Sequence, residues 1–143
     1  MKKLNSLFAM SKNMTNILFW VFFLMTFAIV GCGNPGVRGK VVYSDDKSPL
    51  PRGVVNFVKD GFIARGQIDS NGNYVIGSKR AGDGLPAGEY KVYITGTSRE
   101  INPNLGGGLE RIINPKYEQP TTSGLELSVK GSQTFNIEVE RFD

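Results

Sequence analysis

Apolar and polar residues alternate along much of the chain from Val37 onward. The alternation is clearest in residues 37–43, 88–97 and 133–140, where apolar side chains fall mostly at every second position. A period of two indicates strands with one buried and one solvent-facing side, as in antiparallel sheets. No stretch of this part of the sequence has a convincing helical repeat. The pattern therefore predicts a fold built of strands.

Turn-forming residues separate these strands at short intervals, for example Asp45-Asp46 and Asp60-Gly61. The expected strands are residues 37–43, 53–59, 62–68, 73–77, 88–97, 125–130 and 133–140. Short strands at this spacing are typical of a β-sandwich. We therefore expect an all-β fold, a seven-stranded Greek-key β-sandwich. Its expected core consists of Val37, Val41, Val55, Phe57, Ile68, Tyr74, Ile76, Tyr90, Val92, Ile94, Leu125, Leu127, Val129, Phe135, Ile137 and Val139.

Several segments carry the turn and core residues of a known domain family. Residues 37–41 (VRGKV) and 49–57 (PLPRGVVNF) are similar to its opening G-x-V and P-L-x-G-A-x-V-x-F. Residues 68–74 (IDSNGNY) resemble its T-D-x-x-G-x-Y hairpin, and residues 85–92 (LPAGEYKV) its L-P-x-G-x-Y-x-V segment. These motifs resemble the carboxypeptidase regulatory-like, or transthyretin-like, domain. The resemblance implies a transthyretin-like sandwich over residues 37–143.

The end of the chain extends this resemblance. Residues 114–117 (NPKY) and 122–125 (TSGL) are similar to a short form of the domain that is abundant among lipoproteins of planctomycete-type bacteria. All of these motifs consist of turn and core residues. They are therefore specific for the fold and carry little information about function.

The first 31 residues differ in character from the rest. Lys2, Lys3 and Lys12 precede residues 17–30 (ILFWVFFLMTFAIV), a run of 14 residues without a charge. A basic region, a short apolar run and small residues after it describe a secretory signal peptide. A membrane-spanning helix needs roughly 20 apolar residues, so this run is short for a permanent anchor. We expect residues 1–31 to be a signal peptide.

Cys32 is the only cysteine of the chain and follows the apolar run directly after Gly31. Residues 29–32 (IVGC) resemble the bacterial lipobox, in which the Cys is acylated and becomes the mature N-terminus. The resemblance implies lipid chains on Cys32 that hold the protein on a membrane, with residues 32–36 as a short tether. The alternative is a chance cysteine after a cleaved signal or an uncleaved anchor. Gly33 is not the Asp that retains some lipoproteins in the inner membrane, which favours the outer membrane or cell surface.

The leader also changes the meaning of the net charge. The whole chain has a formal charge of +4 and a pI near 9.3. Three of its lysines belong to the leader, which leaves 14 basic and 13 acidic side chains from Cys32 onward. No basic cluster there is longer than Lys79-Arg80. Because nucleic-acid binding needs a basic surface, we expect no nucleic-acid partner.

The composition excludes several kinds of chemistry. The chain has no His, so an imidazole base or metal ligand is excluded. One Cys excludes an intrachain disulfide and a four-thiolate zinc site. The transthyretin-like fold hosts hydroxyisourate hydrolases, but these depend on His and a Tyr-Arg-Gly-Ser C-terminus, whereas this chain ends in residues 140–143 (ERFD). We expect no enzymatic activity, no metal and no cofactor.

Two polar loops each allow a ligand-binding interpretation and a structural one. Residues 69–73 (DSNGN) suggest calcium, but such a site needs six or more oxygens and only Asp69 is charged. A hairpin turn in which Asn71-Gly72 adopt positive φ angles is favoured. Residues 106–108 (GGG) lack the Gly-Lys-Ser/Thr of a phosphate loop and are interpreted as a loop tip.

Residues 98–124 form an unusually long connection of 27 residues. Connections this long without secondary structure are uncommon and are often functional. The candidates for partner contact in it are Arg99, Arg111, Lys116 and Tyr117. The structural alternative is a packed loop in which Ile112, Ile113 and Tyr117 cover the edge of a sheet.

These observations favour an exported, non-enzymatic and lipid-anchored β-sandwich of the cell envelope that acts as a structural or interaction module. Its expected partners are the membrane, through Cys32, and an envelope protein or glycan. The alternative is a small carbohydrate-, peptide- or ion-binding module that uses residues 98–124. Sugar binding has little support, because Trp20 is the only Trp and lies in the leader.

Overall fold

The structure is a computed structural model that describes residues 33–101 and 107–142. The described residues consist of strands, loops and one short 3-10 helix. The elements are β1 (Val37–Tyr43), β2 (Gly53–Lys59), β3 (Phe62–Ile68), β4 (Asn73–Val75), β5 (Gly88–Thr95), β6 (Ser98–Glu100), β7 (Leu109–Arg111), η3 (Pro115–Glu118), β8 (Leu125–Val129), β9 (Gln133–Thr134) and β10 (Ile137–Val139). No helix of the described residues is long and apolar enough to cross a membrane. The predicted signal peptide and Cys32 lie outside the described residues.

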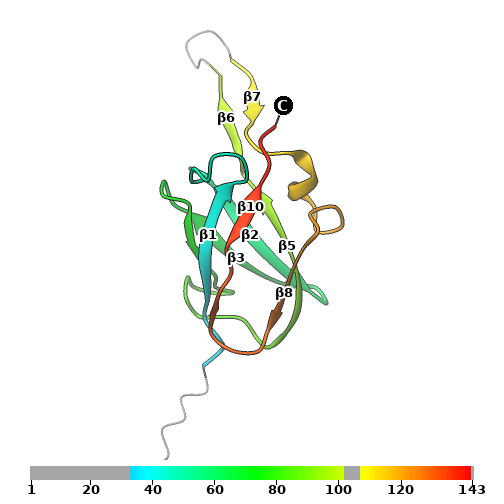
Figure 1. The fold of residues 1–143 in the computed structure, drawn as a ribbon. Helices are drawn as coiled ribbons and strands as arrows, with labels where there is room; N and C mark the ends of the chain where they lie inside the picture. The colour runs from blue at the N-terminus through cyan, green and yellow to red at the C-terminus, as the bar shows by residue number, and fades with distance from the viewer. Residues whose placement is uncertain (1–32, 102–106, 143) are drawn as a thin grey trace, which may run out of the picture. The chain divides into compact units, whose positions relative to one another are not determined.

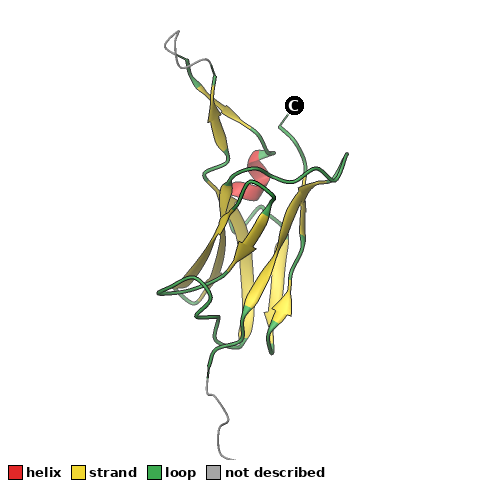
Figure 2. Ribbon diagram, turned by 90° about the vertical axis from the view of Figure 1, so that its left-hand side faces the viewer, coloured by secondary structure: helices red, strands yellow, loops and turns green. Residues whose placement is uncertain are grey.

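Two sheets pack face to face (Figures 1 and 2). One sheet has the order β3-β2-β5-β8 and is antiparallel throughout. In the other sheet, β1 is the central strand. It pairs antiparallel with β4 on one side. On its other side it pairs parallel with both β9 and β10. The all-β sandwich predicted from the alternation is therefore confirmed.

All seven predicted strands are present, but the last one is split into β9 and β10. The break occurs at Phe135 and Asn136, where the chain crosses Gly39 of β1 so closely that a Cβ on Gly39 would lie 1.9 Å from the Phe135 carbonyl oxygen. Asn136 leaves the ladder and accepts a hydrogen bond from the Lys40 N–H through its side chain, at 3.1 Å. The close approach of the two backbones explains the interruption.

The core lies between the two sheets. Of the predicted core residues, only Leu125, Leu127 and Phe135 are partly buried rather than fully buried. The structure adds six buried apolar residues that the alternation did not single out: Tyr43, Leu50, Ala64, Leu85, Ile113 and Tyr117. Leu50, Leu85 and Ile113 lie in connections between strands, where no period of two exists to reveal them.

The prediction that residues 98–124 form a long connection without secondary structure is wrong. It contains a two-stranded hairpin, β6 with β7, and the 3-10 helix η3. Each of these strands has only three residues, too few for an alternating pattern to identify. The hairpin lies at one end of the sandwich, opposite the end at which the chain enters β1 (Figure 1).

The residues expected to form a tether are partly docked on the domain. The Pro35 carbonyl accepts a hydrogen bond from the Leu85 N–H at 2.9 Å. The Gly36 N–H donates to the Ser132 hydroxyl at 3.0 Å. The chain is thus attached to the sandwich two residues before β1 begins.

Candidate functional site

The four residues predicted for partner contact lie near one end of the sandwich, where β5 leads into the hairpin. Arg99 is on β6, Arg111 on β7, and Lys116 and Tyr117 are on η3. Antiparallel register places Arg99 opposite Glu110. The residues belong to one region of the fold, but their charged groups do not converge on a common point.

Each predicted cation is paired with a carboxylate of the same chain. Arg99 Nε lies 2.5 Å from Glu110, Arg111 Nε 3.6 Å from Glu118, and Lys116 Nζ 2.6 Å from Glu140. The hydrogen bond that Arg99 donates to Glu110 raises the pKa of Arg99, and the one that Lys116 donates to Glu140 raises the pKa of Lys116. Exposed pairs of this kind contribute little to stability, because solvent screens them. Their effect is to orient the side chains along the surface.

Tyr117 is buried, with 7% of its surface exposed, which agrees with the structural alternative for this segment rather than with partner contact. The Lys116 ammonium lies 5.0 Å from the centre of its ring. Asn114 caps η3 by accepting the Lys116 N–H at 3.1 Å. Tyr117 is therefore a packing residue of the sandwich end.

Residues 112–123 cover the part of the β5 edge that extends beyond the end of β8. The last register pair of β5 and β8 is Val92 with Leu125. Ser123, which precedes β8, donates its hydroxyl to the Val92 carbonyl at 2.5 Å. Ile113 is fully buried against the core. The expected covering of a sheet edge is confirmed for this half of the segment.

The hairpin is the exposed half of the segment. Leu109 on β7 is 73% exposed, and Ile101, which follows β6, is 50% exposed. In the described part of the chain, β6 and β7 pair only with each other. Sequence reasoning missed both apolar residues. The available signal was limited to one pair of opposite charges, Arg99 and Glu110, which the register places across from each other.

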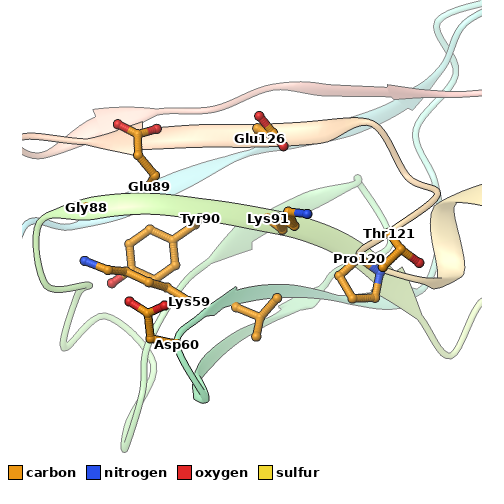
Figure 3. A pocket seen from close by; sticks show the side chains of 10 residues that line it. Lys59, Asp60, Gly88, Glu89, Tyr90, Lys91, Pro120, Thr121 and Glu126 are labelled. Atoms are coloured by element: carbon orange, nitrogen blue, oxygen red, sulfur yellow. The ribbon is translucent and has the colours of Figure 1, made fainter.

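A shallow groove of about 650 Å³ lies on the β2-β5-β8 sheet (Figure 3). Its lining residues are Val58, Lys59, Asp60, Gly88, Glu89, Tyr90, Lys91, Pro120, Thr121 and Glu126. The groove mixes both signs of charge, and the Tyr90 hydroxyl donates to the Pro86 carbonyl at 2.8 Å. Burial raises the pKa of Tyr90. The groove thus offers polar contacts without a concentrated charge.

The loop at residues 69–73 is a turn, as predicted, but it leads from β3 of one sheet to β4 of the other, and only Gly72 has the expected positive φ, whereas Asn71 does not. Asp69 accepts hydrogen bonds from the N–H groups of Asn71 and Asn73, both at 2.8 Å. These bonds, mainly those from Asn73, lower the pKa of Asp69. Gly72 has φ +82°, and a Cβ there would lie 2.5 Å from the Val41 carbonyl. Across residues 33–101 and 107–142, no three His, Cys, Asp or Glu side chains are grouped so that they could hold a metal ion.

Comparison with known proteins adds two distant structural similarities. No protein-family model matches the chain, and no curated protein matches it. A DUF3823 family protein from Bacteroides ovatus ATCC 8483 is 17% identical with a TM-score of 0.43, over 74% of this chain and 44% of that one. BcpA*(D312A), the major pilin subunit of Bacillus cereus, is 14% identical with a TM-score of 0.48, over 78% and 30%. The chain spans less than half the length of either protein.

Proposed function

We propose that the protein is a lipid-anchored β-sandwich of the cell envelope that acts, without enzymatic activity, as a structural or interaction module. The observation that carries this proposal is that the chain enters β1 at one end of the sandwich and the β6–β7 hairpin lies at the opposite end (Figure 1). An acylated Cys32 would hold the Gly33 end at the membrane. The hairpin would then point away from the membrane, toward other components of the envelope.

The hairpin has the features of a contact element. Leu109 is the most exposed large apolar residue of the described chain, at 73%. Burying such a side chain against a partner is favourable, by about 2 kcal/mol if burial is complete. The ion pairs Arg99–Glu110 and Arg111–Glu118 hold the polar side chains of the hairpin in place. The apolar residues are therefore the groups left to meet a partner.

The finer identity of the domain is part of the proposal. The motifs that resemble the carboxypeptidase regulatory-like family lie on β1, on β2, on the turn before β4 and at the start of β5. Gly72 in the motif of residues 68–74 occupies the positive-φ position of its turn. This agreement between motif and backbone supports a carboxypeptidase regulatory-like domain.

One experiment in intact cells of the native host tests both parts of the proposal. Wild type, Cys32→Ser, Leu109→Ser and Ile63→Ser are compared for fatty-acid labelling, detergent partitioning and crosslinked products. Ile63 is the control for Leu109, since it is also exposed, at 41%, but lies on β3 of the sandwich. We expect Cys32→Ser to lose labelling and partitioning. Leu109→Ser is expected to lose a crosslinked product that Ile63→Ser retains.

Two results would contradict the proposal. Full labelling of the Cys32→Ser protein would exclude the lipid anchor. Identical crosslinked products in the Leu109→Ser and Ile63→Ser proteins would exclude the hairpin as the contact element.

A further inference from the structure

The chain enters the sandwich at a closely packed point. Besides the hydrogen bonds of Pro35 and Gly36, Gly84 approaches this entry segment so closely that a Cβ on it would lie 2.6 Å from the carbonyl oxygens of Asn34 and Pro35. Only Gly33 separates Asn34 from Cys32. Two residues of chain reach at most about 7 Å. An acyl anchor on Cys32 would therefore keep this end of the domain close to the membrane surface.

Three segments surround the entry point: residues 34–38, 77–85 and 130–134. Residues 77–85 contact residues 34–38 through the Leu85 N–H, and residues 130–134 contact them through the Ser132 hydroxyl. Together they form what we call the base surface, at the end of the sandwich opposite the hairpin (Figure 1). The exposed basic residues of the base surface are Arg38, Lys79, Arg80 and Lys130. Among the described residues, none of these four forms an ion pair.

Asp83 is the one acidic residue on these segments. Its carboxylate accepts hydrogen bonds from the N–H groups of Ser78, Lys79 and Arg80, at 2.6, 2.8 and 3.2 Å. Its oxygens thus face backbone donors rather than the ammonium and guanidinium groups. The positive charges of the base surface are left for an external anion.

The three segments of the base surface are more basic than the rest of the chain after Cys32. The base surface carries four basic residues and one acidic residue, which leaves ten basic and twelve acidic residues in the rest of the chain after Cys32. The base is therefore positive, and the remainder is slightly negative. All ion pairs of the described residues lie outside the base surface.

A hollow of about 370 Å³ opens beside the entry point. Arg38, Ser132 and Thr134 are among the residues that line it. A guanidinium with neighbouring hydroxyl groups is suited to binding phosphate oxygens. The hollow therefore adds a hydrogen-bonding position for a phosphate group to the positive surface.

We propose that the base surface docks on the headgroups of anionic phospholipids and holds the sandwich upright on the membrane. This inference rests on the proposed acylation of Cys32, which brings the base surface within a few ångströms of the headgroups. Basic residues near an anionic bilayer are attracted to it, and the attraction decays within about 8 Å at physiological salt. Docking orients the hairpin away from the membrane.

The test uses the acylated full chain in vesicles of phosphatidylcholine, with or without an equal share of phosphatidylglycerol. Lysine acetylation by a water-soluble reagent is followed by mass spectrometry. We expect Lys79 and Lys130 to react about threefold more slowly, or slower still, on the anionic vesicles, and high salt to abolish the difference. Lys40 and Lys91, exposed residues outside the base surface, should react equally on both vesicles.

Matched triple variants provide a second readout. A dye on Leu109→Cys reports the distance of the hairpin from labelled headgroups by energy transfer. On anionic vesicles, the variant K79Q/R80Q/K130Q is expected to show about twofold higher transfer, because a domain that has lost this attraction tilts. The variant K40Q/R65Q/K91Q, which loses the same charge elsewhere, should match the unsubstituted protein. Equal melting temperatures of the two variants show that both are folded.

The outcomes separate this inference from the proposed function. Absence of acylation at Cys32 overturns the anchor and the docking together. An acylated, vesicle-bound protein whose Lys79 and Lys130 react equally on both kinds of vesicle overturns docking alone. Protection of equal size on neutral vesicles, unaffected by salt, also overturns it.

Discussion

Side-chain hydroxyl groups bond to backbone carbonyls at several points where the sheets are irregular. The Tyr74 hydroxyl donates to the Phe135 carbonyl at 2.5 Å, at the break between β9 and β10. The Tyr90 hydroxyl binds the Pro86 carbonyl just before β5. Burial raises the pKa of Tyr74, so this side chain remains a neutral donor at physiological pH. These residues satisfy carbonyl groups that no neighbouring strand reaches.

Replacing Tyr74 by Phe tests this role. The variant keeps the ring in the core but leaves the Phe135 carbonyl without its donor, so we expect a loss of about 1 to 2 kcal/mol in the free energy of unfolding. Tyr93→Phe is the control, since Tyr93 is half-buried and its hydroxyl makes no hydrogen bond within the described residues. Urea unfolding measures both. Equal stability of the two variants would contradict the assigned role.

Two aspartates hold loops through backbone N–H groups. Hydrogen bonds from Lys79, Ser78 and Arg80 lower the pKa of Asp83 to about 2, and those from Ser48 lower the pKa of Asp46 to about 2. Because the folded-state pKa is below the ordinary value of 3.8, the folded protein favours the charged form. The resulting stabilisation is complete above about pH 4 and is lost as the pH falls toward 2.

The stability of an Asp83→Asn variant, measured as a function of pH, tests whether this stabilisation is lost as the pH falls. We expect the variant to melt at a lower temperature than the wild type near pH 6, and the difference to shrink as the pH falls from 4 to 2. Circular-dichroism melts across this range provide the measurement. Asp60→Asn is the control, because the Asp60 carboxylate accepts no hydrogen bond from a described residue. A difference between Asp83→Asn and wild type that does not change with pH would refute the explanation.

At the scale of elements, residues 98–124 divide into two parts with different roles. The hairpin extends from the sandwich and buries little apolar surface. Residues 112–123 cover the edge of β5 and contribute Ile113 and Tyr117 to the core. Deleting the whole segment would therefore remove core residues together with the hairpin, and a test of the hairpin needs substitutions confined to it.

Two substitutions separate these parts. Ile113→Ala is expected to lower the free energy of unfolding by about 3 kcal/mol, because it leaves a cavity in the core. Leu109→Ala, on the exposed hairpin, should change it by no more than about 0.5 kcal/mol. Denaturant unfolding of both variants provides the comparison. A large loss for Leu109→Ala would show that the hairpin packs on the domain, against the interaction role proposed for it.

At the scale of the whole described domain, the unpaired cations of the base surface and the most exposed apolar side chain, Leu109, occupy opposite ends. The base surface around Gly33 carries unpaired cations, whereas the hairpin carries Leu109 and paired charges. A domain attached to the membrane at its base would place the cations against the anionic headgroups. Its hairpin would then present Leu109 to a partner. The net charge of the sequence does not reveal this polarity, because it sums both ends.

The sequence by itself determined the strands of the sandwich, because an alternating strand buries every second side chain regardless of its partners. It also determined the turn at residues 69–73, since Gly72 supplies the positive φ and Asp69 accepts the N–H groups of Asn71 and Asn73 within the same loop. Tertiary structure alone decided the break over Gly39, the burial of Leu85, and the choice between the packed loop and the partner-contact alternative for Tyr117. Each of these depends on contacts between residues far apart in the chain, which no local pattern encodes.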